Sequence, residues 1–392
     1  MSTRIVFVDD ELNILQAMGR SFHSMRNEWN MEFLSSGAAA LESLAKAPAD
    51  VIVSDMRMPG MDGWQLLGEV KKRYPQTVRL VLSGHADSSS VMRAVGIAQL
   101  YLAKPCESGA LKAAILQTQM LRQLLSSDQL ALLVGGVDML PSAPTAFQEI
   151  LQCLQNPAAS LTDAAQIIGR DVAMTANIMK LVNSAFFGSR RPSTTIDRAV
   201  AYLGMDTLGA LVLGHSVFQS GVATGIDGFS LEELWQHTEQ TAAAARAIAL
   251  SENLSVARAD EAFLAGVLHD VGKVVFATKA AALPHDTTDV AAQMEAHHAE
   301  VGAYLLGLWG FPNSIVEAVA FHHTPSRASE KGLGLSGIVH VADRLVHLRS
   351  ENRSASIDTG LQPGYLESLG LEHCLPKWSA VLQSLDDRKA AA

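Results

Sequence analysis

The sequence predicts two fold classes in one chain, an α/β doubly wound parallel sheet followed by an all-α domain. In the first 120 residues, short apolar runs end in polar residues: "RIVFVDD", "VIVSD", "VRLVLSG" and "LYLAKP". Helix-compatible stretches separate these runs, which indicates parallel strands covered on both faces. Beyond residue 136, stretches such as "SLTDAAQIIGRDVAMTANIMKLVNSAFFG" show the 3.6-residue period of helices, with Ser160 and Asp163 placed to cap the first turn.

Composition limits the classes of function. The 392 residues are 48% hydrophobic, enough for two or three domains to bury their own cores. A formal net charge of -10 argues against broad attraction to nucleic acid, and against attraction to anionic membranes. The start "MSTRIVFVDD" is predicted to be a strand and not an export signal. The uncharged stretch 207–226 contains too many polar residues and glycines for a membrane span, so no membrane insertion is expected. Three cysteines, Cys106, Cys153 and Cys374, form no close pair, which favours a reducing cytoplasm.

Polar residues follow or end the four apolar runs. Asp9 and Asp10 follow the first, Asp55 ends the second, Ser83 ends the third, and Lys104 follows the fourth. Ligands bind at the carboxyl ends of parallel strands, so these side chains are predicted to lie on one rim. Three carboxylates on one rim would repel each other unless a hard cation lay among them. Oxygen ligands predict Mg²⁺.

Residues 1 to 122 resemble a response-regulator receiver domain of the flavodoxin-like fold, through "VDDE", "SDMRMPGMDG", "LSGHA" and "LAKPC". The resemblance implies that Asp55 accepts a phosphoryl group from a sensor histidine kinase or a phosphotransfer protein. Asp9, Asp10 and Asp55 would hold Mg²⁺, while Lys104 would pair with the phosphoryl oxygens and Ser83 would hydrogen-bond them. Tyr101 matches the family's aromatic switch position, although an ordinary strand aromatic remains an alternative.

Residues 108–133 have apolar residues at helical spacing and no proline, which predicts that the last receiver helix continues into a connector. The stretch "VGGVDMLPSAP" then breaks the pattern near residue 136. We therefore expect a receiver domain over 1–122, a continuous connector helix over 108–135 and an all-helical output domain over 136–385.

Histidines and carboxylates gather in the second half of the chain, in "LEELWQHTEQ", "LHDVGK", "EAHHAEVG", "AFHHTP" and "VHVADRL". Taken singly, each histidine is more often a buried side chain that hydrogen-bonds a carbonyl than a metal ligand. Helical bundles nevertheless build metal sites from such residues on several helices. Mixed nitrogen and oxygen ligation is typical of Fe, Mn, Zn or Ni.

These motifs, with "LPSAP", "LVNSAFFG", "AVAYLG" and "HAEVGAYLLGLWGFP", resemble the HD superfamily of metal-dependent phosphohydrolases and, within it, the HDOD output domain. The resemblance implies that Lys273 contacts a substrate phosphate. It also implies a set of metal ligands: His237, His269, Asp270, His298, His322, His323 and Asp343, with Glu233 for a third metal. The hydrolases of the HD-GYP type follow their paired histidines with a glycine-rich loop ending in Gly-Tyr-Pro, whereas this chain reads "HHTPSRASEKGLGLSG".

Two functions of different class therefore stay open. HDOD domains are usually regarded as interaction modules, so phosphorylation at Asp55 would control binding to a downstream signalling protein whose identity the sequence does not give. The alternative is a metal-dependent cyclic di-nucleotide phosphodiesterase in which the metals activate water. The sequence leaves open whether the protein forms a homodimer.

Overall fold

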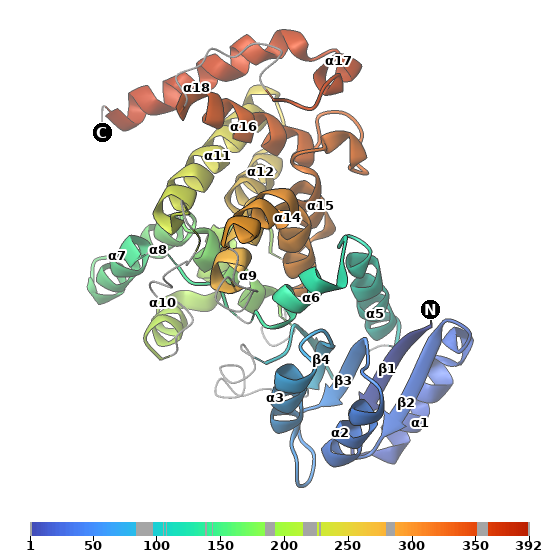
Figure 1. Cartoon of the computed structure of the whole chain (residues 1–392). Coiled ribbons are helices and arrows are strands. Elements are labelled where there is room, and N and C mark those ends of the chain that lie inside the picture. The colour runs from blue at the N-terminus through green and yellow to red at the C-terminus, as the bar shows by residue number, and fades with distance from the viewer. Residues whose placement is uncertain are drawn as a thin grey trace. The chain divides into compact units, whose positions relative to one another are not determined.

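The computed structural model describes residues 2–83, 97–104, 106, 108–137, 139–142, 144–184, 193–214, 226, 229–279, 287–350 and 360–390. The chain divides into two compact units, one formed mainly by residues 1–139 and the other mainly by residues 140–392 (Figure 1). Parts of the motifs "LSGHA" and "LVNSAFFG" lie outside the described residues, as does most of 207–226 beyond Gly214. No helix among those described is long and apolar enough to cross a bilayer.

The first unit contains a five-stranded, wholly parallel sheet in the order β2-β1-β3-β4-β5. Its strands are β1 (Thr3–Val8), β2 (Trp29–Leu34), β3 (Val51–Asp55), β4 (Val78–Ser83) and β5 (Leu100–Ala103). The helices that go with it are α1 (Leu12–Ser21), α2 (Gly37–Lys46), α3 (Gly63–Arg73), α5 (Ser108–Arg122) and α6 (Asp128–Gly135), with a 3₁₀ turn at His23–Met25. The predicted doubly wound class is confirmed.

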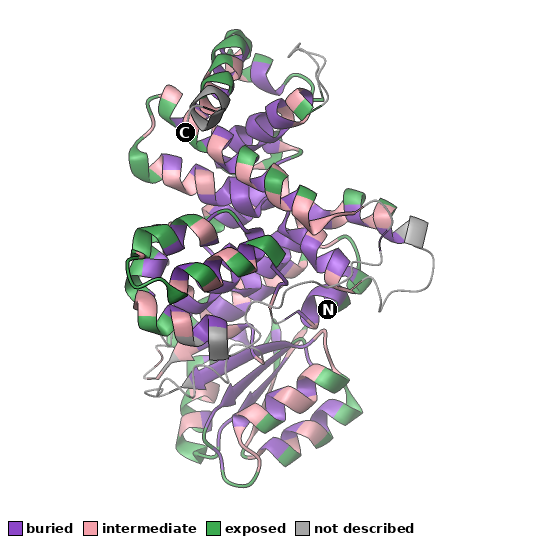
Figure 2. Ribbon diagram, turned by 90° about the vertical axis from the view of Figure 1, so that its left-hand side faces the viewer, coloured by how far each residue is buried: buried purple, intermediate pink, exposed green. Residues whose placement is uncertain are grey.

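The central strands are buried because helices cover both faces of the sheet, as the purple strands in Figure 2 show. Ile5, Val6 and Phe7 on β1, Ile52 on β3 and Leu80 on β4 are fully buried. Continuous apolar strands of this kind suit a sheet with no solvent-facing side. The continuous apolar residues that predicted these strands are therefore the residues that pack against the helices on both faces of the sheet.

The connector is two helices and not one, so the expected continuous helix over 108–135 is wrong. Helix α5 ends at Arg122, and α6 begins at Asp128 after Ser127 as N-cap. The intervening segment contains Ser126 and Ser127. Serine and aspartate compete with helical backbone bonds and favour caps and turns, which explains the break.

Helix α6 contacts the receiver sheet through Arg79, a charged residue on β4 that is only 1% exposed. The Arg79 guanidinium donates to the carbonyl oxygen of Gly135 at 3.0 Å, and also to the carbonyls of Ile97 and Thr77. A Cβ atom at Gly135 would lie 1.9 Å from the carbonyl oxygen of Pro75, so glycine permits this close approach. The connector is thereby held at the edge of the sheet where β4 begins.

The second unit is helical throughout its described residues, apart from turns and a single bridge residue. Its helices are α7 (Pro144–Gln155), α8 (Leu161–Ile168), α9 (Val172–Asn183), α10 (Ile196–Gly214), α11 (Leu231–Ser251), α12 (Val256–Leu268), α13 (Val271–Lys279), α14 (Thr287–Leu308), α15 (Asn313–Phe321), α16 (Leu335–Ser350), α17 (Tyr365–Leu369) and α18 (Leu375–Ala390), with 3₁₀ turns at Pro325–Arg327 and Glu372–Cys374. Ser160 and Asp163 form the predicted capping box at the start of α8.

Candidate functional site

The receiver site lies at the carboxyl ends of the strands. Lys104, directly after β5, places its Nζ atom 2.5 Å from Oδ1 of Asp55 and 2.8 Å from Oδ2 of Asp9. Asp9 is 2% exposed and Asp55 8%, whereas Asp10 is exposed at the same rim. Burial alone would lower the pKa of Lys104, but Asp55 and Asp9 outweigh it and raise that pKa.

Backbone groups fix the two buried carboxylates. The N–H of Arg57 donates to Oδ2 of Asp55 at 2.8 Å, and the N–H of Glu11 donates to Oδ1 of Asp9 at 3.0 Å. Gly63, the first residue of α3, lies so close to Asp55 that a Cβ atom there would be 2.2 Å from the Asp55 carbonyl oxygen. Only glycine fits at this position. The "MDG" sequence therefore permits a turn tight enough to bring the helix against the end of β3.

The other two predicted receiver residues lie on β4 and β5. Ser83 is the last residue of β4 and pairs with Ala103 on β5, so its backbone reaches the same rim. Tyr101 is buried on β5, where its hydroxyl oxygen accepts a hydrogen bond from the N–H of Ala98. Burial raises the pKa of the Tyr101 hydroxyl.

The second unit holds the histidine cluster, which we define as His237, His269, Asp270, His298, His322, His323 and Asp343. The members come from α11, the α12–α13 junction, α14, the end of α15 and α16. The cluster offers three sets of ligand atoms that lie within 4.8 Å of one another: His237, His269 and Asp343; His269, Asp270 and His322; and His298, His322 and His323. Glu233 is exposed on the first turn of α11 and belongs to none of these sets.

Close helix packing brings the cluster together. His269 and Asp270 lie between α12 and α13, where one helix ends and the next begins. A Cβ atom at Gly266 would lie 2.6 Å from the Cα atom of Ala242 on α11, and one at Gly272 would lie 1.9 Å from the carbonyl oxygen of His298 on α14. Without side chains at these two glycines, α12 approaches α11 and α13 approaches α14. The glycine of "HDVGK" therefore has a packing role beside the cluster.

Asp270 lies between the two ends of the cluster. Its Oδ1 atom is 3.1 Å from Nε2 of His298, and its Oδ2 atom is 3.4 Å from Nε2 of His269. The ammonium of Lys273 donates to Oδ2 at 2.9 Å. Burial opposes the carboxylate, but His269, Lys273 and His298 outweigh burial and hold the pKa of Asp270 well below its usual value. Each oxygen of Asp270 thus faces a different group of imidazoles.

Backbone carbonyls orient three of the imidazoles. The Nδ1 atoms of His269, His298 and His322 lie 2.7, 3.0 and 2.7 Å from the carbonyl oxygens of Gly266, Met294 and Val319. A carbonyl only accepts, so each Nδ1 carries the proton and each Nε2 is directed into the cluster. Metal-binding histidines are oriented by the same kind of contact.

The Nε2 atoms face one another at short distances. His298 Nε2 lies 3.4 Å from that of His322 and 3.0 Å from that of His323, and the His237–His269 distance is 3.3 Å. Burial lowers the pKa of His322 well below its usual value, with repulsion from His323 adding to the effect. Burial also lowers the pKa of His323, to about 4, whereas Asp270 and Asp343 outweigh burial at His269 and raise its pKa. His322 and His323 are therefore neutral and direct lone pairs at neighbouring imidazole nitrogens. A shared cation removes that repulsion.

The spacing also suits a transition-metal ion. Oδ1 of Asp343 lies 3.0 Å from Nε2 of His237 and 3.7 Å from that of His269, and although burial opposes the carboxylate, these two imidazoles hold the pKa of Asp343 well below its usual value. Ligands about 2.0–2.1 Å from a tetrahedral ion lie about 3.3 Å apart, close to the distances between these three atoms. The residues present therefore fit a cation with nitrogen and oxygen ligands.

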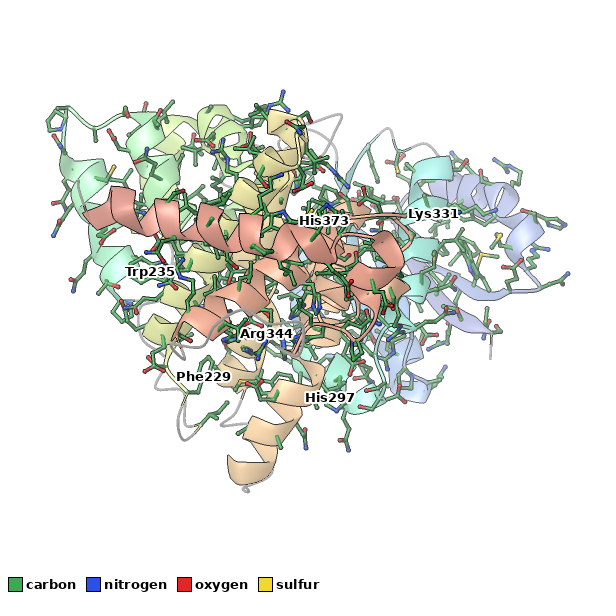
Figure 3. The ribbon with its side chains drawn as sticks, turned by 90° about the horizontal axis from the view of Figure 1, so that it is seen from above. Phe229, Trp235, His297, Lys331, Arg344 and His373 are labelled. Carbon is green, nitrogen blue, oxygen red and sulfur yellow. The ribbon has the colours of Figure 1, made fainter. Side chains whose placement is uncertain are left out.

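Two histidines near the cluster have other roles. His340 is a satisfied buried histidine, with Nδ1 donating to the carbonyl of His322 at 2.7 Å and Nε2 accepting from the N–H of Gln362 at 2.8 Å. His297, labelled in Figure 3, pairs with Glu300 and belongs to none of the three sets.

A residue that the sequence reasoning missed is His347, which contacts two cluster members. Its Nε2 atom lies 3.4 Å from Oδ1 of Asp343, and its ring stacks on that of His237. The four-residue spacing of Asp343 and His347 on one helical stretch was the signal that could have identified it.

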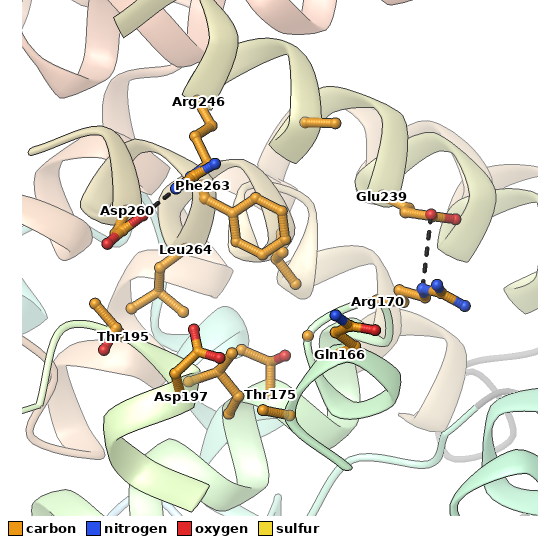
Figure 4. A pocket seen from close by; sticks show the side chains of 15 residues that line it. Gln166, Arg170, Thr175, Thr195, Asp197, Glu239, Arg246, Asp260, Phe263 and Leu264 are labelled. Carbon is orange, nitrogen blue, oxygen red and sulfur yellow. Dashed lines mark hydrogen bonds and ion pairs between the residues drawn. The ribbon is translucent and has the colours of Figure 1, made fainter. Parts of the chain in front are cut away.

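A separate pocket of about 290 Å³ lies among α8, α9, α10, α11 and α12 (Figure 4). The Phe263 ring lies between two ion pairs in this view, Arg246–Asp260 at 3.0 Å and Arg170–Glu239 at 3.9 Å. None of the cluster residues lines the pocket. Helices α11 and α12 contribute to both features with different residues.

Comparisons with known proteins identify both parts of the chain. The family model for response regulator receiver domains matches residues 5–116, and that for HDOD domains matches residues 140–325. The chain is a response regulator of two-component signalling. More narrowly, it combines a receiver domain with an HDOD domain.

Curated relatives match parts of the chain. An uncharacterized protein of Treponema pallidum (strain Nichols) is 28% identical over 228 residues, which cover 55% of this chain and 44% of that protein. The hydrogenase transcriptional regulatory protein HoxA of Cupriavidus necator is 36% identical over 97 residues, 25% of this chain and 20% of that protein. This chain thus spans less than half the length of either relative.

Two solved structures are similar to parts of the chain. The MmoQ response regulator of Methylococcus capsulatus (strain Bath) is 22% identical, covering 62% of this chain and 94% of that one with a TM-score of 0.44. The receiver domain of an HD domain-containing protein from Pseudomonas fluorescens Pf-5 is 27% identical, covering 31% of this chain and 98% of that one with a TM-score of 0.30.

Proposed function

We propose that phosphorylation of Asp55 controls an HDOD output domain that signals by binding a downstream protein. The observation that carries the proposal is the Lys104 ammonium, which lies within ion-pair distance of both Asp55 and Asp9. Receiver domains are usually phosphorylated by a histidine kinase or a phosphotransfer protein, and such a protein is the expected phosphodonor.

The charges at the rim suit phosphoryl transfer. A carboxylate is a poor nucleophile toward a phosphate dianion until neighbouring cations neutralise the charge that builds up. Lys104 supplies one such cation, and Mg²⁺ held by Asp9, Asp10 and Asp55 would supply the other. Once Asp55 is phosphorylated, Lys104 would pair with a phosphoryl oxygen and Ser83 would hydrogen-bond another. Tyr101 would then act as the switch.

We propose that the signal leaves the receiver through α6. The break at residues 123–127 makes one stiff rod from residue 108 to residue 135 impossible. Arg79 instead ties the end of α6 to β4, the strand that ends in Ser83. A shift of Ser83 toward the phosphoryl group could pass along β4 to Arg79 and change how α6 is held.

We propose that the histidine cluster binds Fe, Mn, Zn or Ni in a structural or regulatory role. His237, His269 and Asp343 would hold one ion and His298, His322 and His323 another, with Asp270 between them. When bound, such ions neutralise charge and act as Lewis acids. The phosphodiesterase alternative is not favoured, because the output region matches the HDOD model and "HHTPSRASE" lacks the glycines and tyrosine of the hydrolase loop.

The phosphorylation proposal is tested with acetyl phosphate and Mg²⁺. Mass spectrometry should show one added phosphoryl group on the wild-type protein and none on Asp55→Asn. The matched control is Asp62→Asn, which changes a partly exposed aspartate that caps α3. Equal labelling of Asp55→Asn and the wild type would contradict the assignment.

The coupling proposal is tested by hydrogen exchange with and without beryllofluoride, a phosphoryl mimic. Amides in 128–135 and beyond residue 136 should change protection in the wild type, and the distant changes should shrink in Arg79→Met. Changes confined to residues 1–122 in the wild type would contradict the proposed route.

The metal proposal is tested by anaerobic reconstitution with Fe²⁺ or Mn²⁺, followed by metal analysis. The wild type should retain metal, and His269→Ala should lose most of it, whereas His297→Ala should not. Incubation with cyclic di-GMP should give little linear product. Robust turnover that Asp270→Ala abolishes would overturn the regulatory role.

A further inference from the structure

The pocket in Figure 4 combines an apolar wall with a charged rim. Its volume of about 290 Å³ lies at the lower end of the range of small-molecule sites, about 300–1,000 Å³, so it suits a side chain or a small metabolite and not a dinucleotide. Phe263, Leu264 and Ile196 are part of the wall. A Cβ atom at Gly169 would lie 3.3 Å from Cγ2 of Ile196 and 3.7 Å from Cε1 of Phe263. The missing side chain at Gly169 therefore keeps space open between the end of α8 and α12.

The rim carries one more carboxylate than it has cations. Its two guanidinium groups each pair with a carboxylate, Arg170 with Glu239 at 3.9 Å and Arg246 with Asp260 at 3.0 Å. The third carboxylate, Asp197, makes no hydrogen bond or ion pair with any residue that the structure describes. It belongs to the first turn of α10 and points into the pocket (Figure 4). The lining thus has a net negative charge, which favours a cation over a phosphate or another anion.

The ring of Phe263 indicates which kind of cation fits. Phe263 is partly exposed, and its ring is seen nearly face on between the two ion pairs (Figure 4). The face of an aromatic ring is electronegative and attracts cations. A guanidinium group is planar and weakly hydrated, so it stacks on such a face and can donate two parallel hydrogen bonds to one carboxylate, whereas an ammonium is compact and strongly hydrated. A ring wall beside a free carboxylate therefore favours guanidinium.

An ordinary helix start is the competing explanation for Asp197. A carboxylate on the first turn of a helix is favoured by the helix dipole, whatever lies beside it. The dipole accounts for the type of residue at this position, but it gives no reason for an apolar cavity in front of the carboxylate. A bound cation accounts for both.

We propose that this pocket binds a guanidinium group, stacked on Phe263 and paired with Asp197. The group comes either from an arginine of a bound protein or from a free guanidino compound, because both carry the same planar cation. The site lies apart from the histidine cluster, so it does not depend on the metal proposal.

The test titrates the full-length protein with the Nα-acetyl methylamides of arginine, lysine and citrulline, followed by saturation-transfer NMR. Citrulline has nearly the shape of arginine without its charge. The arginine compound should bind saturably, the lysine compound about tenfold more weakly, and the citrulline compound not measurably at the same concentrations. Free arginine distinguishes the two sources: tighter binding of free arginine indicates a metabolite, and tighter binding of the blocked arginine indicates a protein partner.

Variants assign the bound group to the pocket. Asp197→Asn keeps the shape but removes the charge, so the blocked arginine should bind about tenfold more weakly. Phe263→Leu keeps the wall apolar but removes the ring face, which should weaken binding about two- to fivefold. Ala243→Leu fills part of the pocket, leaves every charge in place and should also weaken binding. Asp206→Asn, an exposed aspartate on α10 outside the pocket, is the matched control and should bind like the wild type.

Three results would overturn the proposal. Equal affinity for the arginine and citrulline compounds would show that charge plays no part. Unchanged affinity in Asp197→Asn would place the bound group elsewhere on the protein. The absence of saturable binding by both free and blocked arginine would show that the pocket takes no guanidinium group. Circular dichroism checks that the helices of each variant are intact, and Ala243→Leu keeps the test decisive if Asp197→Asn loses helical structure.

Discussion

The receiver site and the histidine cluster both place a lysine against buried aspartates, but they balance charge differently. At the receiver rim, Lys104 lies between Asp9 and Asp55, and its side chain is 24% exposed. In the cluster, Lys273 pairs with Asp270, while His269, His298 and His322 are at most 1% exposed and direct nitrogen atoms at one another.

The difference indicates two modes of use. The receiver rim sets one lysine against Asp9, Asp55 and the exposed Asp10, so it carries a net negative charge that suits a divalent cation bound together with a phosphoryl group that is added and removed. The cluster leaves the lone pairs of its buried members facing each other, and only its rim, at His323, is exposed, so repulsion among the buried groups is poorly screened. It therefore suits a resident cation, and its stability should depend on that ion far more than the receiver depends on Mg²⁺.

Metal removal should give the largest contrast. An ion present at about 1,000 times its dissociation constant adds about 4 kcal/mol to the free energy of unfolding. Chelation of the metal-loaded protein should lower the unfolding free energy of the output domain by about that amount and leave the receiver nearly unchanged. Hydrogen exchange of the slowest amides in 231–350 and in 3–83 measures the two domains separately. An equal loss of unfolding free energy in the two domains would contradict the predicted difference between them.

The Arg79→Met substitution should have the next largest effect, this time in the receiver. It leaves the carbonyl groups of Ile97, Thr77 and Gly135 without the guanidinium that now donates to them. Each buried acceptor left without a partner costs about 1–3 kcal/mol, so we expect a loss of about 3 kcal/mol in urea unfolding. Arg4→Met, at the partly exposed Arg4–Glu32 pair, is the control and should cost less. A loss below about 1 kcal/mol would mean that α6 is not held by Arg79.

Gly272→Ala should damage the cluster without touching a ligand. The added Cβ atom would lie 1.9 Å from the carbonyl oxygen of His298, so α13 and α14 would have to separate. Overpacking of this kind costs about 1–3 kcal/mol, and the separation should also weaken metal binding, because it moves Asp270 away from His298. Gly209→Ala, in a helix of the same domain with nothing within 4 Å of the new Cβ atom, is the control. Unchanged metal content in Gly272→Ala would show that the cluster tolerates this movement.

The two sites also differ in how far the sequence predicts them. Strand ends carry Asp9, Asp55 and Lys104 to one rim by topology, so a correct strand assignment is enough to bring them together. Helix junctions have no such rule: "LHDVGK" indicates a metal motif, but the approach of α13 to α14 depends on a contact at Gly272 that only the fold reveals. His347 was missed because half-exposed histidines are ordinary. The connector break was missed because apolar spacing continues across Ser126 and Ser127 and masks the turn.

Gly68→Ala should give the smallest effect and the opposite sign. Gly68 lies within α3 of the receiver, and a Cβ atom there would have nothing within 4 Å. Alanine reduces the conformational freedom of the unfolded chain and is the better helix former, so the free energy of unfolding should rise by about 0.5–1 kcal/mol. Labelling of Asp55 by acetyl phosphate should stay the same, because α3 contacts Asp55 at Gly63 and not at Gly68. A loss of stability at high protein concentration, but not at low concentration, would instead show that a second copy of the chain packs on this face of α3. The difference in stability change between Gly68→Ala and Gly272→Ala would then depend on contacts between two copies of the chain as well as on packing within one chain.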